Sequence, residues 1–123
     1  MSGDASRCYE CEVELVLKDY VHVTQVGWVR VIDRTAGPVL QCTRCGEPRL
    51  TMEQLAGYQR RALATALRDG CFDDGGVFKR ARRALGLSRE DLVILLGCDP
   101  ADVEIWEKVG GTRTANLALV ALL

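Results

Sequence analysis

The sequence has few residues suited to acid–base catalysis: its 123 residues include one histidine, His22. It shows no Ser-His-Asp set, no Cys-His pair and no glycine-rich phosphate-binding loop. A single histidine offers little scope for moving protons during a reaction. We therefore expect that the protein is not an enzyme.

Neither sign of charge is in excess, and no long hydrophobic run is present. Sixteen Lys and Arg residues face 17 Asp and Glu, so the net charge of −1 gives the whole chain no attraction for phosphates. The longest apolar run, residues 117–123, is far too short to span a bilayer. The first residues, MSGDASR, lack the apolar segment of an export signal. These features predict a cytoplasmic protein without a membrane segment.

Cysteine, in contrast, is plentiful, with six residues in the chain. In a reducing compartment, metal binding is more common than a disulfide framework. Four of the six form two pairs, CYEC at 8–11 and CTRC at 42–45. Between them, residues 13–23 alternate in polarity with the apolar side chains at odd positions, and residues 27–34 follow as a second strand. A small antiparallel sheet with a cysteine pair at each end is therefore expected.

This arrangement is typical of a zinc ribbon, in which two short loops present four thiolates to one Zn²⁺. The predicted ligands are Cys8, Cys11, Cys42 and Cys45. Four protein ligands leave no open position for water, so the zinc is expected to be structural. The alternative is a set of four buried free cysteines. His22 lies on the even, more polar face of its strand, where an exposed residue is expected rather than a ligand.

Helical signals dominate the rest of the chain. Thr51 and Gln54 form a capping-box pattern before a helix over 52–69, whose apolar stripe contains Met52, Leu55, Leu63 and Leu67, and Gly70 ends it. Shorter helices are predicted over 77–85, 89–96, 100–108 and 113–123, with Ser88 and Asp99 as N-caps. The predicted fold class is α+β: a zinc-ribbon domain over 1–50, a connector helix over 51–70 and an all-α domain over 71–123.

The segment LGLSREDLVILLGCDPADVEIWEKVGG, residues 85–111, resembles a helix-turn-helix of the Xre/Cro type. Its core would contain Leu92, Leu95, Leu96, Val103 and Trp106. With the cysteine pairs in front and the phrase CTRCGEPRLT at 42–51, residues 8–120 look like the MqsA/YgiT-type antitoxin family. The resemblance implies a dimeric regulator with structural zinc, an Xre domain that binds a palindromic operator, and an N-terminal domain that binds a toxin.

The helix that should read DNA bases, over residues 99–108, is acidic. The positions that would reach base edges hold Ala101 and Ile105, which cannot form bidentate contacts with bases, and Asp102 and Glu104 flank them. Acids close to phosphates oppose binding. Positive charge lies instead over residues 77–89, which contain five cations and no acid up to Arg89.

Two functions therefore remain open. The first is a DNA-binding, antitoxin-like regulator with weak base readout, whose contacts would come from Arg89, Lys108, Thr112, Arg113, Lys79, Arg80 and Arg83. The second is an adaptor that does not bind DNA and docks a partner protein through Asp102, Glu104 and Ile105. The apolar stretch 115–123 predicts a homodimer, with the stripe of the connector helix as the other candidate surface. Cys98 is expected to be a buried core thiol, and Cys71 is open to being an exposed reactive thiol.

Overall fold

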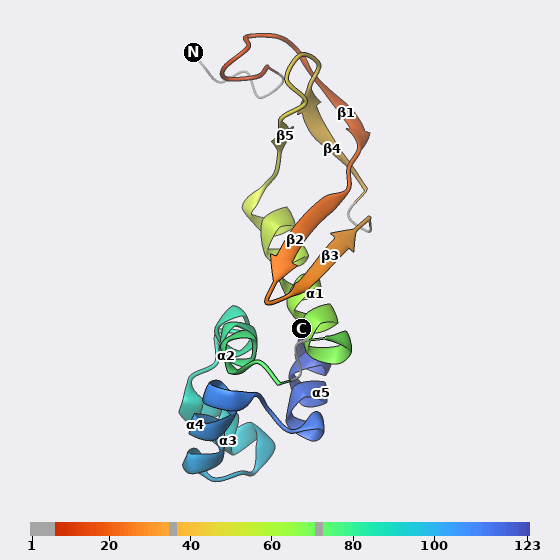
Figure 1. The fold of residues 1–123 in the computed structure, drawn as a ribbon. Coiled ribbons are helices and arrows are strands. Elements are labelled where there is room, and N and C mark those ends of the chain that lie inside the picture. Colours follow the sequence, from red (N-terminus) through yellow and green to blue (C-terminus); the bar gives the residue numbers. More distant parts are fainter. Residues whose placement is uncertain (1–6, 35–36, 71–72) are drawn as a thin grey trace.

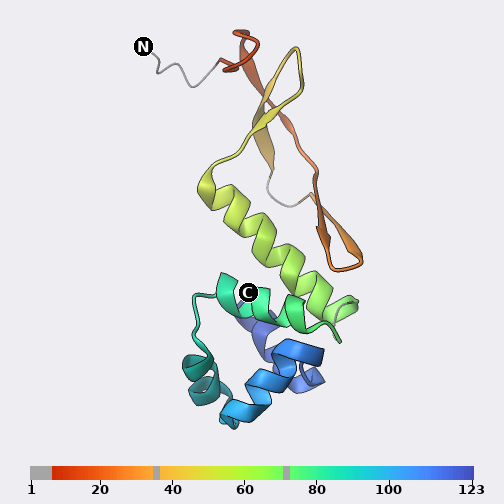
Figure 2. The ribbon, with the colours of Figure 1, turned by 60° about the vertical axis from the view of Figure 1, so that its left-hand side comes forward.

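The structure is a computed structural model, and it describes residues 7–34, 37–70 and 73–123. A three-stranded antiparallel sheet lies at one end, the helices α2 to α5 lie at the other, and the long helix α1 runs between them with a two-stranded hairpin along its side (Figures 1 and 2). The α+β class predicted from the sequence is confirmed. The elements are β1 (Leu15–Asp19), β2 (His22–Val26), β3 (Val29–Asp33), β4 (Pro38–Cys42), β5 (Pro48–Arg49), α1 (Met52–Asp69), α2 (Gly75–Ala84), α3 (Arg89–Leu96), α4 (Pro100–Val109) and α5 (Arg113–Leu122).

The prediction of a single strand over residues 13–23 is wrong. The structure has two strands there, and each belongs to a different sheet. β1 pairs with β4, which pairs with β5, whereas β2 and β3 form a separate hairpin. The division follows Asp19, whose partner in the ladder is Pro38. Proline has no N–H to donate, so the ladder ends there and the chain is free to turn into the hairpin.

The prediction of which side chains in this stretch face inward is also wrong. In β2 the even positions face α1, so that Val26 is buried and His22 is half-buried, while Val21 and Val23 are 41% and 47% exposed. The imidazole of His22 stacks on the ring of Tyr58 in α1, with 4.3 Å between the ring centroids. A shift of one residue in a strand moves every side chain to the opposite face. The expected exposure of His22 is therefore corrected.

Helix α1 begins as predicted, since the side chains of Thr51 and Gln54 form the capping box. The apolar stripe is shorter than expected, because Met52 is 82% exposed and Leu55 is 36% exposed. Burial starts one turn later, where the hairpin and the other helices cover the residues Tyr58, Ala62, Leu63, Ala66 and Leu67. The first turn of α1 therefore adds little to the core formed by the described residues.

One hydrophobic core joins the hairpin to the helices. Val26 and Val31 of the hairpin belong to the same cluster as Phe78 of α2 and Leu119 of α5. A second, smaller cluster surrounds the cysteines, with Cys8, Leu15 and Cys42 buried. The ribbon end therefore has little apolar burial of its own to hold it folded.

The predicted core of the paired helices is confirmed in part. Leu92 and Val103 are fully buried, and Leu96 and Trp106 pack against them while partly exposed. Leu95 is 52% exposed, so its expected burial is wrong. Helix α3 is only eight residues long, so its two turns bury one face, and Leu92 is the fully buried residue on that face. No helix in the described ranges is both long and apolar enough to cross a membrane.

Candidate metal centre and binding surfaces

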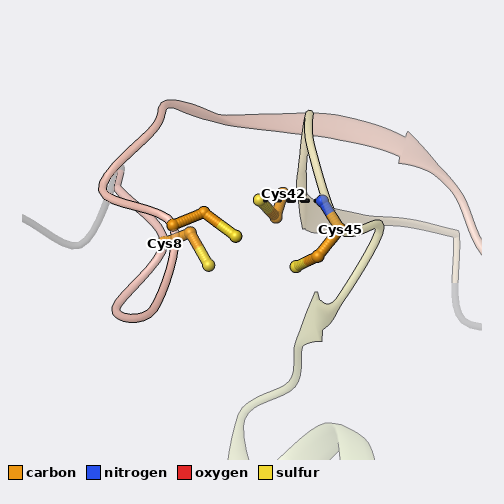
Figure 3. A group of neighbouring side chains, drawn as sticks. Cys8, Cys42 and Cys45 are labelled. Carbon is orange, nitrogen blue, oxygen red and sulfur yellow. Dashed lines mark hydrogen bonds between the residues drawn. The ribbon is translucent and has the colours of Figure 1, made fainter.

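The four cysteines of the two pairs come together at the end of the ribbon. The Sγ atoms of Cys8, Cys11, Cys42 and Cys45 all lie within 4.8 Å of one another. Thiolates bound to one tetrahedral Zn²⁺ at about 2.3 Å lie about 3.8 Å apart, so the thiols need only a small contraction to meet an ion. Figure 3 shows Cys8, from the loop before β1, facing Cys42, the last residue of β4, and Cys45, from the loop that follows. This group can hold a metal ion.

The two cysteine loops share one backbone conformation. The N–H of Glu12 donates to the carbonyl of Cys8, and the N–H of Gly46 donates to that of Cys42, each over 3.0 Å. Both residues that follow the second cysteine have a positive φ, 56° at Glu12 and 73° at Gly46. Glycine accepts this conformation freely, whereas a residue with a Cβ pays about 1–2 kcal/mol for it. The first loop therefore adopts the same turn as the second, although its positive φ falls on a glutamate.

Backbone N–H groups point at the sulfur atoms of the second loop. The N–H groups of Arg44 and Cys45 donate to the Sγ of Cys42 over 3.3 and 3.4 Å, and that of Glu47 donates to Cys45 over 3.4 Å. The hydrogen bond from Cys45 N–H, followed by that from Arg44, lowers the pKa of Cys42 to about 6. Hydrogen bonds of this kind favour a thiolate, which is the form that binds metal.

The fourth thiol behaves differently. Its hydrogen bond to Cys45, and then burial, raise the pKa of Cys11 to about 12. A thiol with a raised pKa holds its proton at neutral pH, and an ion must displace that proton to bind. Metal binding at this site is expected to release protons and to strengthen as the pH rises.

Strand pairing closes the gap of 30 residues between the cysteine pairs. Leu15 stands opposite Cys42 in the β1–β4 ladder. The side chain and the N–H of Thr43 both donate to the carbonyl of Glu14, over 3.2 and 3.4 Å. The N–H of Cys8 donates to the carbonyl of Val13 over 2.8 Å. The sheet thus sets one cysteine loop beside the other.

At the opposite end of the chain, α3 and α4 are joined by a turn of three residues, Gly97, Cys98 and Asp99. Gly97 has the left-handed φ of 63° that ends α3. Ser88 and Asp91 form a capping box at the start of α3, and Asp99 and Asp102 form another at the start of α4. Asp91 and Asp102 therefore stabilise helix ends in addition to adding negative charge.

A buried ion triad connects α2, α3 and α4. Glu107 accepts hydrogen bonds from the Nε of Arg82 over 2.8 Å and from the Nε of Arg89 over 2.5 Å. The side chain of Glu107 is 2% exposed and that of Arg82 is 10% exposed. Burial alone raises the pKa of Glu107, but the hydrogen bonds from both arginines outweigh it and hold the pKa below its usual value. The spacing of these three residues in the sequence gave no signal of the triad.

The predicted DNA contacts come from four different helices. Arg89 donates to Glu107, so part of its charge is neutralised within the fold. The Nζ of Lys108 lies 3.7 Å from the Oε1 of Glu104, which stands one helical turn earlier in α4. Thr112 caps α5 and Arg113 is its exposed first residue. Of the predicted contacts on α2, Arg80 and Arg83 are exposed and Lys79 is half-buried.

The predicted docking residues lie on the outward side of α4. Ile105 is 54% exposed, Glu104 is exposed, and Asp102 is half-buried because it caps the helix. Sequence reasoning missed the largest apolar exposure nearby, Ile94 of α3, which is 81% exposed. Its position in an apolar run, LVILL, favoured burial instead.

The remaining cysteines were not predicted as ligands. Cys98 is half-buried and packs against the main core, in partial agreement with the expected core thiol. Burial, and then the negative charge of Asp102, raise the pKa of Cys98, so its thiol stays protonated. Cys71 lies outside the described residues.

The comparisons with known proteins give this chain no family. No protein-family model matches it, and no curated protein matches it. What the geometry supports directly is an α+β chain with a group of four cysteines that could hold a metal ion.

Proposed function

We propose that the four cysteines bind one Zn²⁺ and that the ion is structural. Four thiolates in a tetrahedral arrangement are a common zinc set, and they leave no position for a reacting water. The cluster around Cys8, Leu15 and Cys42 is small, so metal binding would supply part of the folding free energy of the ribbon.

We propose further that the protein is an adaptor that docks a partner protein through α3 and α4. The observation that carries this proposal is the exposed surface of α4, where Ala101 and Ile105 stand beside Glu104. Exposed apolar side chains are typical of a contact surface for another protein, and the acid beside them can pair with its cations. These side chains offer neither donors for base edges nor cations for phosphates.

The second candidate is the DNA-binding, antitoxin-like regulator that the family resemblance implies. Two features favour it: the short turn between α3 and α4, and the exposed Arg80 and Arg83 of α2. Among the described residues, neither of these arginines forms an ion pair. Contacts of this kind reach phosphates, so binding would fall steeply with salt and discriminate little between sequences.

Two measurements separate the candidates. The first is a titration of the protein with its own promoter and with a scrambled duplex at two salt concentrations. The adaptor predicts no promoter-selective complex, whereas a tight and selective complex would establish the regulator. The second is capture of a partner by the native protein and by the charge reversal Asp102→Lys with Glu104→Lys.

A matched reversal at the ribbon end, Glu10→Lys with Glu47→Lys, controls for net charge, because both residues are exposed. The adaptor predicts that the reversal in α4 abolishes capture and that the ribbon reversal does not. Capture that survives the α4 reversal would contradict docking through this helix.

A further inference from the structure

A groove runs between α3 and α4. It is lined by Val93 and Ile94 of α3 and by Pro100 and Ala101 of α4, with charged residues at its rim. Ile94 is 81% exposed and takes no part in the hydrophobic core. The fold therefore gains little from this large apolar side chain.

The apolar surface continues along α4. Ala101, Ile105 and Val109 are spaced by four residues and so lie on one face of the helix. Ile105 is 54% exposed and Val109 is 62% exposed. Isolated exposed apolar residues are ordinary, but a groove and an adjoining stripe on two packed helices are typical of an interaction site.

The charge of this region differs in sign from the rest of the chain. Residues 88–109 contain six acids and two cations, a net charge of −4, which leaves +3 for the remaining residues, given −1 overall. Both cations already lie opposite acids, since Arg89 contacts Glu107 and Lys108 lies near Glu104. Among the residues that line the groove, two acids, Glu90 and Glu104, stand beside one cation, Arg89, which contacts Glu107.

One acid at the rim has no such neighbour. Glu90, in the first turn of α3, is exposed and forms no ion pair with any described residue. Glu104 stands across the groove, 60% exposed and held by Lys108 only at 3.7 Å. An exposed pair at that distance contributes little, so Glu104 stays available to an incoming cation.

We infer that the groove between α3 and α4 binds a basic amphipathic helix of a partner protein. This inference rests on the proposed docking function and adds the chemistry of the partner. Apolar side chains of the helix, three and four residues apart, would pack against Ile94, Ala101 and Ile105. Its Lys and Arg residues would lie opposite Glu90 and Glu104, where opposite charges favour association.

The test uses the full metal-loaded chain and two synthetic helical peptides of about 16 residues, long enough to form roughly four turns. Both carry leucine at the same positions of one face, and the other face carries Lys and Arg in one peptide and Glu in the other. Affinity is measured by fluorescence anisotropy at two salt concentrations. The basic peptide is expected to bind at least about 10-fold more tightly than the acidic peptide, with a preference that shrinks at high salt.

Variants locate the site. Ile94→Ser with Ile105→Ser is expected to weaken the basic peptide at least about 10-fold, since each buried methyl-rich side chain contributes over 1 kcal/mol. Glu90→Gln with Glu104→Gln is expected to remove most of the preference between the peptides. Leu17→Ser, a matched control in β1 where Leu17 is 66% exposed, should leave both affinities unchanged. The substituted residues are exposed, and circular dichroism checks that each variant is folded.

Several results would overturn the inference. Equal or tighter binding of the acidic peptide, weakened by the isoleucine variant, would reject a basic partner and leave docking at this groove in place. Binding of neither peptide would reject a helical ligand, while partner capture decides the docking function separately. Self-association that the isoleucine variant abolishes would assign the groove to a second copy of the chain. Binding of a labelled DNA duplex that the same variant abolishes would reject both the inference and the adaptor.

Discussion

Replacing Glu107 by glutamine tests the buried triad that holds α2, α3 and α4 together. The substitution keeps the shape of the side chain and removes its charge. Arg82, with a side chain only 10% exposed, would then keep a buried positive charge without its carboxylate. Loss of one partner from a buried ion pair costs about 3–5 kcal/mol.

The lower end of that range applies here. Arg89 is 52% exposed, so water replaces most of what it loses. Arg82 keeps its hydrogen bond to the carbonyl of Leu87 over 2.8 Å. We therefore expect Glu107→Gln to lower the free energy of unfolding by about 3 kcal/mol, a large part of the roughly 5–15 kcal/mol that a domain has in total.

The assay is urea denaturation followed by circular dichroism, with the unfolding free energy taken from the midpoint and slope. Glu104→Gln is the matched control on the same helix, because Glu104 is 60% exposed and pairs with Lys108 only at 3.7 Å. That control is expected to change the unfolding free energy by less than about 0.5 kcal/mol. If the Glu107 variant loses no more than the control, the triad does not stabilise the fold as argued.

We also expect Glu107→Gln to change how the free energy of unfolding depends on pH. The hydrogen bonds of the two arginines hold the pKa of Glu107 below its usual value despite burial, which on its own raises it. A carboxyl of this kind stabilises the fold above its unfolded pKa of about 4.3, and the contribution is lost as the pH falls through the folded pKa. The native protein should therefore lose stability in acid more steeply than Glu107→Gln.

Three further predictions follow from packing and surface. Gly75→Ala should cost about 1–3 kcal/mol of unfolding free energy, because its Cβ would lie 2.5 Å from the carbonyl oxygen of Glu107; Gly76→Ala, whose Cβ would meet only the carboxylate of Asp74 at 3.2 Å, is the control and should cost less than about 1 kcal/mol. Tyr58→Phe should keep the stability or raise it by up to about 1 kcal/mol, because the buried hydroxyl has no hydrogen-bond partner among the described residues; a clear loss would show a missed partner. Light scattering should give twice the chain mass of 13.5 kDa, since Leu117 and Leu122 of α5 stay 44% and 45% exposed; a monomer would contradict the homodimer.

Local signals in the sequence were reliable predictors of this structure. The two Cys-x-x-Cys pairs have a spacing that fits one metal, and the structure brings their sulfur atoms together. Thr51 and Ser88 begin α1 and α3 as predicted, because a cap depends on residues only three positions apart. Gly97 ends α3 because it adopts a left-handed conformation at no steric cost.

Long-range contacts account for what the sequence did not reveal. The side of β2 that faces inward depends on where α1 lies, so His22 stacks on a tyrosine 36 positions away. The partners of Glu107 are 25 and 18 positions away, on helices whose relative placement no local pattern encodes. The strand break after Asp19 depends on Pro38 across the ladder. The conformation of Glu12 is equally hidden, because its residue type argues against a positive φ.

The most direct test of the metal centre is elemental analysis of the protein purified without added metal. One zinc per chain is expected in the native protein and in the control Cys98→Ser, whose thiol packs against the helical core far from the two cysteine pairs. Cys42→Ser with Cys45→Ser removes two of the four ligands and should abolish the zinc. Native protein without zinc, or a double variant that retains it, would contradict the proposed site.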